Sequence, residues 1–479
     1  MEEHTGMGTS KAQGISRRHF LAWAGVGAAT ALAGRARGEG PPADGSKPNI
    51  IIVLADDMGY ADLGVHGCKD IPTPHIDSLA RNGVRFTDAY VSCPVCSPMR
   101  AGLMTGRYQQ RFGYWYNPGP VDRASEGFGL PLSETTLADA LKEQGYVTGL
   151  VGKWHLGVKP EFHPMARGFD EFFGFVHGGH SYIDANADKA NLIRRGHEPV
   201  DEQEYLTDAF TREAVDFVKR HHEAPFFLYL SYNAVHTPLQ APPKYLDRFP
   251  GIEDLKRRRY AAMLSALDDG VGAVLEALRA HAIEDDTLVV FLSDNGGPPS
   301  ANASRNTPFR GGKGGIQEGG IRVPLLMQWP RRLPKGEVYE RPVISLDLFP
   351  TSVAAAGGRA GCGLDGVDLI PYLAGKKRGA PHDRLFWKRA ASGVVRQGKW
   401  KLVAEVDGAT ALYDLSEDLE EAHDLSGKRP RTVKTLSKAL AEWEAQLKPP
   451  LWERPVRAKR RGKKRGPRQR RPDTKTLSP

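Results

Sequence analysis

Cysteine is scarce in this sequence. Only four of its 479 residues are cysteines, at positions 68, 93, 96 and 362. So few cysteines cannot form a disulfide scaffold in a chain of this length. If the protein is exported, the sequence allows one disulfide, between Cys93 and either Cys68 or Cys362. The chain must instead rely on a buried core, which its length and its hydrophobic content of 40% allow.

Long hydrophobic runs are missing as well. The apolar run Leu21–Ala33 is too short to span a bilayer comfortably, and no other segment is long and apolar enough. It follows the twin-arginine pattern Ser16–Leu21 and ends in small residues typical of a cleavage site. We interpret residues 1–38 as a twin-arginine signal segment, with a buried or anchoring N-terminal helix as the alternative. This interpretation predicts a bacterial protein that the twin-arginine machinery exports to the periplasm or the extracellular space.

Positive charge is unevenly distributed along the chain. The segment Arg454–Lys475 contains twelve Lys or Arg and one Asp, a net charge of +11, so the rest of the +9 chain is close to −2. The basic character therefore describes a tail and not the globular body, and no nucleic-acid partner is expected. A like-charged segment with few apolar residues cannot bury enough surface to fold, so we predict a disordered basic tail at 451–479.

Strand and helix patterns alternate from Pro48 to about residue 375. Asn49–Leu54 and Thr287–Leu292 are short continuous apolar runs, typical of buried parallel strands. In Tyr260–His281, apolar residues repeat every three or four positions, as in an amphipathic helix. This predicts an α/β fold for 48–375, with a large, mostly parallel central sheet flanked by helices. Further strands are expected at 84–91, 147–151 and 225–232, and further helices at 74–81, 137–144 and 205–221.

The pattern changes after residue 375. Short strand-like runs separated by turn residues occupy 384–388, 393–396, 399–404 and 411–415, and a helical pattern follows at 431–447. They predict a C-terminal subdomain over 376–450, built as a small antiparallel sheet with one packed helix.

Two acidic clusters directly follow predicted strands. Asp56 and Asp57 come after the strand 49–54, and Asp294 and Asn295 come after the strand 287–292. Parallel sheets form their sites at the carboxyl ends of the strands. An adjacent Asp pair can also be a solvated turn or a helix cap, but two such clusters at strand ends favour a metal site. Oxygen ligands favour calcium or magnesium over zinc.

The segment Cys96–Arg107 reads CSPMRAGLMTGR. It resembles the signature of the formylglycine sulfatases, Cys-x-Pro-Ser-Arg followed by Leu/Met-Thr-Gly-Arg. Met99 occupies the usual serine position, whereas Cys96, Pro98 and Arg100 keep the Cys-x-Pro-x-Arg frame that implies maturation.

In that family a maturation enzyme oxidises the motif cysteine to an aldehyde, formylglycine (3-oxoalanine). The hydrated aldehyde supplies the nucleophilic hydroxyl. A sulfated geminal diol can collapse back to the aldehyde and expel sulfate, whereas a sulfated serine would be a stable dead end. The resemblance therefore implies that Cys96 is the precursor of the nucleophile and that a formylglycine-generating enzyme is a partner of the chain.

Cys93 and Cys96 have another interpretation, as a thioredoxin-like redox pair or half of a zinc site. A redox pair should open a helix in a small βαβ fold, and a zinc site needs two more nearby ligands. Neither context is evident in the sequence, so we favour the nucleophile.

The resemblance to the sulfatases covers most of the mature chain, from Pro48 to Leu447. Several family-like blocks occur in family order: 49–59, 96–107, 152–157, 233–238, 293–296 and 310–324. The resemblance implies a calcium ion bound by Asp56, Asp57, Asp294, Asn295 and the residue made from Cys96. It further implies that Lys153 and Lys313 hold the sulfate oxygens and that Arg100 fixes the formylglycine hydroxyls. His236 would protonate the leaving alcohol, with Lys313 as a second donor. His155 would take the proton whose removal lets the sulfated diol collapse.

The resemblance thus implies a sulfuric ester hydrolase of the alkaline phosphatase superfamily, similar to arylsulfatases and N-acetylhexosamine-sulfate sulfatases. Its substrate would be a sulfate monoester on a sulfated carbohydrate or an aryl alcohol. Two alternatives stay open. One is a phosphonate monoester or phosphodiester hydrolase with the same nucleophile, and the other is a non-catalytic polyanion-binding protein whose Cys96 is never converted.

A glycine-rich loop at 176–182 contains His177 and His180. Such a loop can line a substrate pocket or can be an ordinary surface loop. The sequence leaves both interpretations open.

Overall fold

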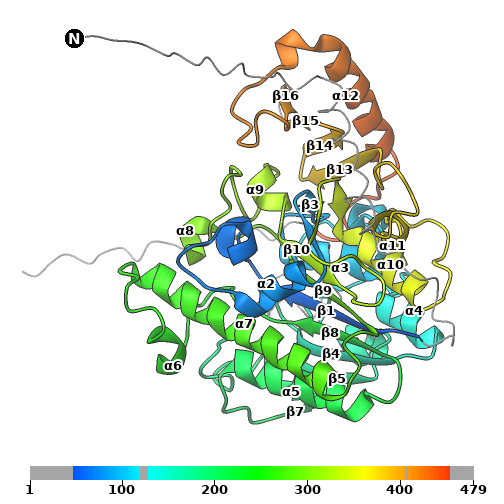
Figure 1. Ribbon diagram of the computed structural model, residues 1–479. Helices are drawn as coiled ribbons and strands as arrows, with labels where there is room; N and C mark the ends of the chain where they lie inside the picture. The colour runs from blue at the N-terminus through cyan, green and yellow to red at the C-terminus, as the bar shows by residue number, and fades with distance from the viewer. Residues whose placement is uncertain (1–46, 119–127, 406–407, 454–479) are drawn as a thin grey trace, which may run out of the picture.

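The computed structural model describes residues 47–118, 128–405 and 408–453 (Figure 1). The predicted signal segment lies outside these residues, as does the tail from residue 454 onward. Trp452 lies within the predicted disordered tail at 451–479, but it is buried against Tyr114 and Phe128, so the prediction is wrong for this residue. Within the described ranges, no helix combines the length and the apolar character that crossing a membrane requires.

The main sheet has ten strands in the order β11-β2-β10-β9-β1-β8-β4-β5-β6-β7. The five strands β9, β1, β8, β4 and β5 run parallel to one another, and β10 is antiparallel to both of its neighbours. The prediction of a large, mostly parallel sheet is confirmed. The strands are β1 (Asn49–Ala55), β2 (Val84–Phe86), β4 (Val147–Lys153), β5 (Glu171–Phe175), β6 (Arg194–Arg195), β7 (Glu198–Pro199), β8 (Phe226–Ser231), β9 (Thr287–Ser293), β10 (Leu325–Gln328) and β11 (Glu337–Tyr339).

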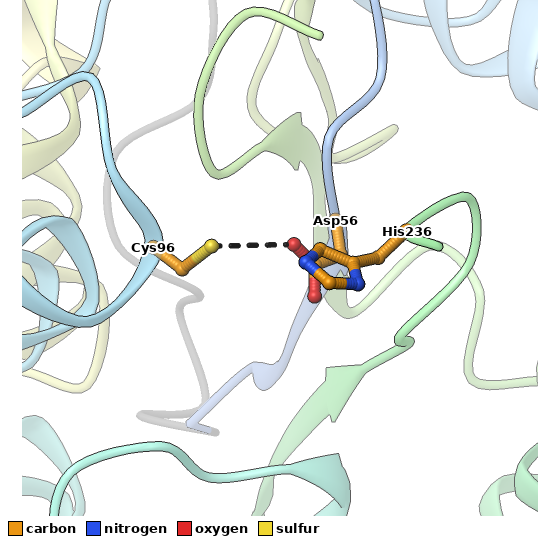
Figure 2. Close-up of side chains that lie close together, drawn as sticks. All are labelled: Asp56, Cys96 and His236. Carbon is orange, nitrogen blue, oxygen red and sulfur yellow. Dashed lines mark hydrogen bonds between the residues drawn. The ribbon is translucent and has the colours of Figure 1, made fainter. Parts of the chain in front are cut away.

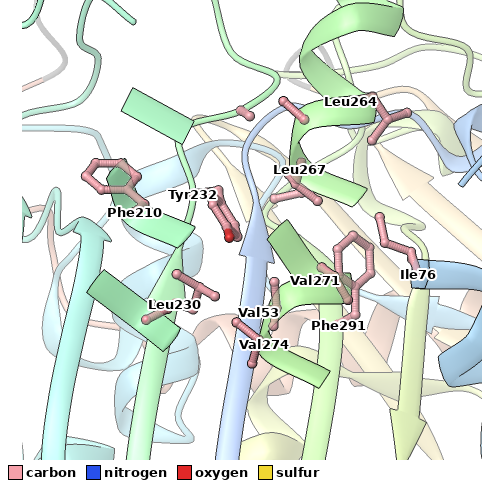
Figure 3. Close-up of a cluster of buried hydrophobic side chains, with 14 of the residues drawn as sticks. Val53, Ile76, Phe210, Leu230, Tyr232, Leu264, Leu267, Val271, Val274 and Phe291 are labelled. Carbon is pink, nitrogen blue, oxygen red and sulfur yellow. The ribbon is translucent and has the colours of Figure 1, made fainter. Parts of the chain in front are cut away.

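Helices cover both faces of this sheet, so its central strands are buried on both sides. Alternate residues of β1 point to opposite layers: Ile51 and Val53 face α2, α5 and α7, whereas Ile52 faces α3, α4 and α10. This double burial explains the unbroken apolar run of the strand. Figure 3 shows Val53 beside Phe291 under the long helix α7. The helices are α2 (Pro74–Arg81), α3 (Cys96–Thr105), α4 (Leu137–Glu143), α5 (Leu206–His221), α6 (Pro243–Leu246), α7 (Leu255–Ala280), α8 (Pro299–Asn302), α9 (Glu318–Ile321), α10 (Leu348–Ala355) and α11 (Ile370–Leu373).

Two of the predicted elements have different bounds in the structure. Helix α7 begins five residues earlier than the apolar periodicity indicates, because the Asp254 side chain caps it by accepting hydrogen bonds from the backbone N–H groups of Lys256 and Arg257. The strand predicted at 84–91 is divided into β2 and β3 (Ala89–Tyr90), and β3 pairs with β12 (Val343–Ile344) in a separate sheet. Asp88 lies at the division, where its carboxylate forms ion pairs with two arginines.

The C-terminal subdomain is the predicted antiparallel sheet with one packed helix, seen at the top of Figure 1. Its strands follow sequence order, and α12 packs its apolar face on them through Leu436, Leu440 and Trp443. The same apolar cluster includes Tyr90 and Ile316 of the main body, so the two parts share a core. The elements are β13 (Arg384–Arg389), β14 (Ser392–Gln397), β15 (Trp400–Ala404), β16 (Thr410–Asp414) and α12 (Pro430–Glu444).

A buried ion network also joins the C-terminal sheet to the main body. The Lys401 ammonium, on β15, lies 2.9 Å from the carboxylate of Glu318 and 2.8 Å from that of Glu421, and all three side chains are fully buried. Tyr90 donates a hydrogen bond of 2.5 Å to Glu318. Burial alone would raise the pKa of Glu318, but Lys401 and neighbouring arginines lower it to about 2.

We expect Glu318→Gln to lower the free energy of unfolding at pH 7 by about 3–5 kcal/mol, because it removes one partner of a buried ion pair. The folded-state pKa of Glu318 lies below its ordinary value of 4.5, so its stabilisation is present above that pH and is lost as the pH falls towards 2. The difference between variant and wild type should therefore shrink in acid. Thermal unfolding across this pH range measures it, with the exposed Glu420→Gln as control. Equal stability of Glu318→Gln and wild type at pH 7 would contradict the account.

Candidate active site

The carboxyl edge of the parallel sheet gathers the acidic residues. Asp56 and Asp57 follow β1, and Asp294 and Asn295 follow the adjacent β9, so the strand pairing brings the two clusters together. Asp57 has a left-handed backbone with φ of 64°, which Asp adopts more readily than most residues. In this conformation its N–H donates to the Asp294 carboxylate at 3.1 Å. All four side chains are buried.

Cys96 is the first residue of α3 and points into this cluster. Its Sγ lies 3.5 Å from Oδ1 of Asp56, and His236 approaches the same carboxylate from another loop (Figure 2). The Lys313 ammonium donates to Sγ at 3.1 Å. The start of a helix favours negative charge, so this position suits a group that handles an anionic substrate.

Arg100 lies one turn further along α3 and fixes the helix to the sheet. Its guanidinium donates to the Asp294 carboxylate at 2.9 and 3.3 Å, to the Ser231 hydroxyl at 2.5 Å and to the Lys153 carbonyl at 3.2 Å. The side chain is fully buried. Because these contacts reach β4, β8 and β9, they set the position of Cys96 relative to the strand ends.

The two predicted lysines reach the acidic cluster from different sides. The Lys153 ammonium, at the end of β4, lies 2.5 Å from Oδ2 of Asp56. The Lys313 ammonium, on the loop before α9, lies 2.7 Å from Oδ1 of Asp57. Burial alone would lower the pKa of Lys313, but Cys96 and the carboxylates raise it well above its ordinary value. The surroundings of Lys313 therefore favour its protonated form.

The two predicted histidines are held differently. His236 Nε2 lies 3.6 Å from Asp57, and its Nδ1 lies 2.6 Å from the Thr237 carbonyl. His155 follows Lys153 and is buried, with its Nδ1 without a hydrogen-bond partner among the described residues. Burial lowers the pKa of both imidazoles, that of His155 well below its ordinary value. The site therefore favours neutral histidines, which can accept a proton.

The redox interpretation of Cys93 and Cys96 is tested by their surroundings. The helix that a redox pair requires is present, although the sequence did not indicate it: α3 begins at Cys96. The fold around it is a ten-stranded sheet and not a small βαβ unit. Burial raises the pKa of Cys93 to about 11 and also raises that of Cys96. Redox thiols require a lowered pKa, so the environment opposes this role.

The cluster fits a hard divalent cation. The ligand atoms of Asp56, Asp57, Asp294 and Cys96 all lie within 4.8 Å of one another. The Oδ1 of Asn295 is buried and has no hydrogen-bond partner in the described part of the chain, so it is available as a further oxygen ligand. Burial and the nearby Asp56 raise the pKa of Asp294 to about 6. Crowded carboxylates with oxygen donors are a site that calcium or magnesium would stabilise.

The loop at 176–182 lies at the site, but both ring nitrogens of His180 are engaged by backbone carbonyls. His180 is buried, and its two ring nitrogens lie 2.7 and 2.8 Å from backbone carbonyls. The loop instead presents Gly178 to His155 and Gly179 to His236. These glycines were not among the predicted site residues, although a glycine doublet between a strand and a buried histidine is a signal that could have identified them.

Fold and site together define a hydrolase of the alkaline phosphatase superfamily. The family model described as "Sulfatase" matches residues 48–358, and the model "N-sulphoglucosamine sulphohydrolase, C-terminal" matches 313–446. The chain belongs to the sulfatase family and is a sulfuric ester hydrolase. The second model begins at Lys313, so it unites the Lys313 loop with the C-terminal sheet.

Known relatives agree with this assignment. Arylsulfatase J of Mus musculus is 33% identical over 476 residues, covering 86% of this chain and 78% of that protein. N-acetylgalactosamine-6-sulfatase of Homo sapiens is 38% identical over 359 residues, and the match spans 68% of this chain but just under two thirds, 66%, of that protein. The crystal structure of Ps i-CgsB is 38% identical, with a TM-score of 0.81 over 86% of this chain and 96% of that one.

We expect calcium to raise the unfolding temperature of the wild type by a few degrees, since a ligand at 100 times its Kd stabilises by about 2.7 kcal/mol. Asp57→Asn should remove most of this increase, because Asn tolerates the left-handed backbone but carries no charge. Thermal unfolding with and without calcium measures it. Asp269→Asn, in a second acidic cluster on α7, is the control. If calcium raised the unfolding temperature of Asp57→Asn as much as that of the wild type, Asp57 would not be a cation ligand.

Proposed function

We propose that this chain hydrolyses sulfate monoesters of a sulfated carbohydrate, using a formylglycine made from Cys96 and a calcium ion bound by Asp56, Asp57, Asp294 and Asn295. The observation that carries the proposal is the position of Cys96. It begins a buried helix within the Cys-x-Pro-x-Arg frame, and its Sγ lies 3.5 Å from Asp56 and 3.1 Å from the Lys313 ammonium. A cysteine surrounded by carboxylates and cations suits nucleophilic chemistry on an anion.

The relatives support a carbohydrate substrate. One crystal structure of Ps i-CgsB, 38% identical to this chain, contains k-i-k-neocarrahexaose. The human relative is named for a sulfated N-acetylhexosamine, and others are named arylsulfatases. We therefore place the sulfate ester on a sugar, with aryl sulfates as convenient test substrates.

The cations of the chain suit the charge of a sulfate ester. When present, the formylglycine hydrate supplies the nucleophilic hydroxyl and the calcium ion supplies positive charge for the sulfuryl oxygens. Lys153 and Lys313 place two ammonium groups on the carboxylates beside Cys96, within reach of an anion bound there. Arg100 neutralises Asp294 and holds the start of α3 in place. Fixed cations in a buried site stabilise developing negative charge more strongly than water does.

Cleavage of the sulfur–oxygen bond leaves an alkoxide that needs a proton. His236 is the proposed donor, because its Nε2 faces the acidic cluster and its Nδ1 is anchored by the Thr237 carbonyl. Burial opposes its protonation, but a bound anionic ester adds negative charge and favours it. Lys313 carries a proton in the same site and can share this role. His155, which burial holds neutral, is the proposed acceptor for the proton released when sulfate leaves.

Maturation and export complete the proposal. The chain would need a formylglycine-generating enzyme, and the motif Ser16–Leu21 would direct it to the twin-arginine machinery. The twin-arginine motif supports a periplasmic or extracellular enzyme of a bacterium.

We expect His236→Ala to lower kcat for a sugar sulfate by about 10²–10⁴-fold, the usual contribution of a general acid. The loss should be at least about tenfold smaller for 4-nitrophenyl sulfate, because 4-nitrophenolate leaves without protonation. The comparison of kcat for the two substrates measures the effect. Exposed His423→Ala is the control, since it lies in the C-terminal subdomain. Equal losses on both substrates would rule out the acid role.

The proposal as a whole is tested by a substrate panel. Protein co-expressed with a formylglycine-generating enzyme should hydrolyse sulfate esters with a higher kcat/KM than the matching phosphate diesters or phosphonate monoesters. Cys96→Ala should lose this activity, and the exposed Cys362→Ala should keep it. A preference for phosphonate esters would instead favour the rival hydrolase. Absence of any turnover by fully converted protein would contradict the proposal.

A further inference from the structure

The loops after β4 and β5 run side by side over the site. The backbone N–H of Trp154 donates to the Phe175 carbonyl at 3.0 Å, and that of His155 donates to the Val176 carbonyl at 3.1 Å. The strand pairing therefore continues beyond the ends of both strands. It brings the glycine pair Gly178-Gly179 against the histidines of the site.

The two glycines leave very different room for a side chain. A Cβ on Gly178 would lie 2.6 Å from Nε2 and 2.7 Å from Cε1 of His155, closer than real contacts allow. A Cβ on Gly179 would lie 3.6 Å from Cε1 of His236, an ordinary van der Waals distance. Neither glycine has a left-handed φ. The two glycines therefore differ in the space that separates them from the neighbouring imidazole, which is small between Gly178 and His155 and ordinary between Gly179 and His236. They do not differ in a need for a left-handed backbone.

The His155 ring depends on packing for its orientation. The Nδ1 of His236 is anchored to a carbonyl at 2.6 Å, whereas the buried Nδ1 of His155 has no such partner among the described residues. The Ser97 hydroxyl donates to the His155 carbonyl at 2.6 Å, which fixes the backbone but leaves the side-chain torsions free. The Gly178 backbone lies against the Nε2 edge of this ring.

The glycine loop cannot easily move away from the ring. The Asn191 amide donates to the Gly179 carbonyl at 3.0 Å, and the neighbouring His180 is held at both ring nitrogens. The Tyr182 hydroxyl donates to the His236 carbonyl at 2.8 Å, and the Tyr182 N–H donates to Gln240 at 2.9 Å. A new side chain at Gly178 would therefore displace the imidazole, which is the mobile end of a side chain, before it displaced the loop.

We propose that Gly178 is a positioning residue for His155: because Gly178 has no side chain, the loop backbone lies directly on the imidazole and holds the ring in its observed orientation. This inference rests on the proposed role of His155 as the proton acceptor of the reaction. The two histidines would then be oriented in different ways: His236 by a hydrogen bond to a carbonyl, and His155 by close packing against a glycine.

The direct test is Gly178→Ala with Gly179→Ala as the matched control. In matured protein with 4-nitrophenyl sulfate, Gly178→Ala should lower kcat by about 10- to 100-fold, the cost of displacing a catalytic group by about 1 Å. KM should change by less than about threefold, because the substrate-holding lysines are untouched. Gly179→Ala should lower kcat less than Gly178→Ala does, because its added Cβ would meet His236 at an ordinary van der Waals distance. Wild-type kcat in Gly178→Ala would overturn the proposal.

A double-mutant cycle with His155→Ala separates positioning from a general structural effect. In the His155→Ala background, Gly178→Ala should cause no further loss of kcat and no loss of unfolding temperature, because the ring it displaces is gone. Equal losses of unfolding temperature in both backgrounds would overturn the proposal. The unfolding measurement needs no turnover, so the contact between Gly178 and His155 is tested even if the chain proves to have no sulfatase activity.

Discussion

The electrostatic balance of the buried cluster around Cys96 is the constraint on which the rest of the structure depends. Three carboxylates at the ends of two adjacent strands lie within 4.8 Å of one another and of the cysteine. Such a group is costly to bury unless opposite charges lie beside it. Arg100, Lys153 and Lys313 provide those charges from α3, β4 and the loop before α9. The fold is arranged so that these distant segments meet at one edge of one sheet.

The need to hold Lys313 beside these carboxylates explains why the C-terminal sheet packs against the main body. Lys313 sits on a glycine-rich loop, which has few side chains of its own to pack. Lys401 of β15 donates to the Ile316 carbonyl at 2.9 Å, and the Glu318 N–H donates to Glu421 at 2.7 Å. These buried contacts hold the chain three and five residues beyond Lys313. The C-terminal family model, which begins at residue 313, describes the same unit.

The sequence predicted what depends on local pattern. Continuous apolar runs identified β1, β8 and β9, and the acidic residues after β1 and β9 marked the edge where the site lies. It did not predict α3, because Pro98 and Gly102 lower its helix propensity, and full burial of the segment outweighs that preference. The short strand β10 was also missed. Its antiparallel direction depends on its pairing with neighbouring strands and not on composition.

Contacts between loops were the other part that the sequence could not supply. Family resemblance identified Lys153, His155, His236 and Lys313. The carboxylate that each lysine meets follows from the strand order for Lys153 and from the course of the loop before α9 for Lys313. The role of Gly178 depends on how close its loop comes to His155: a Cβ added at this position would lie only 2.6 Å from the Nε2 of His155. No spacing or periodicity in a single chain encodes such a distance.

The chemical state of Cys96 tests the central claim most directly. The measurement is the mass of the proteolytic peptide that contains Cys96, from protein co-expressed with a formylglycine-generating enzyme. The account predicts the mass of the aldehyde in place of that of the thiol, despite Met99 within the motif. An intact thiol, or a disulfide between Cys96 and Cys93, would contradict it.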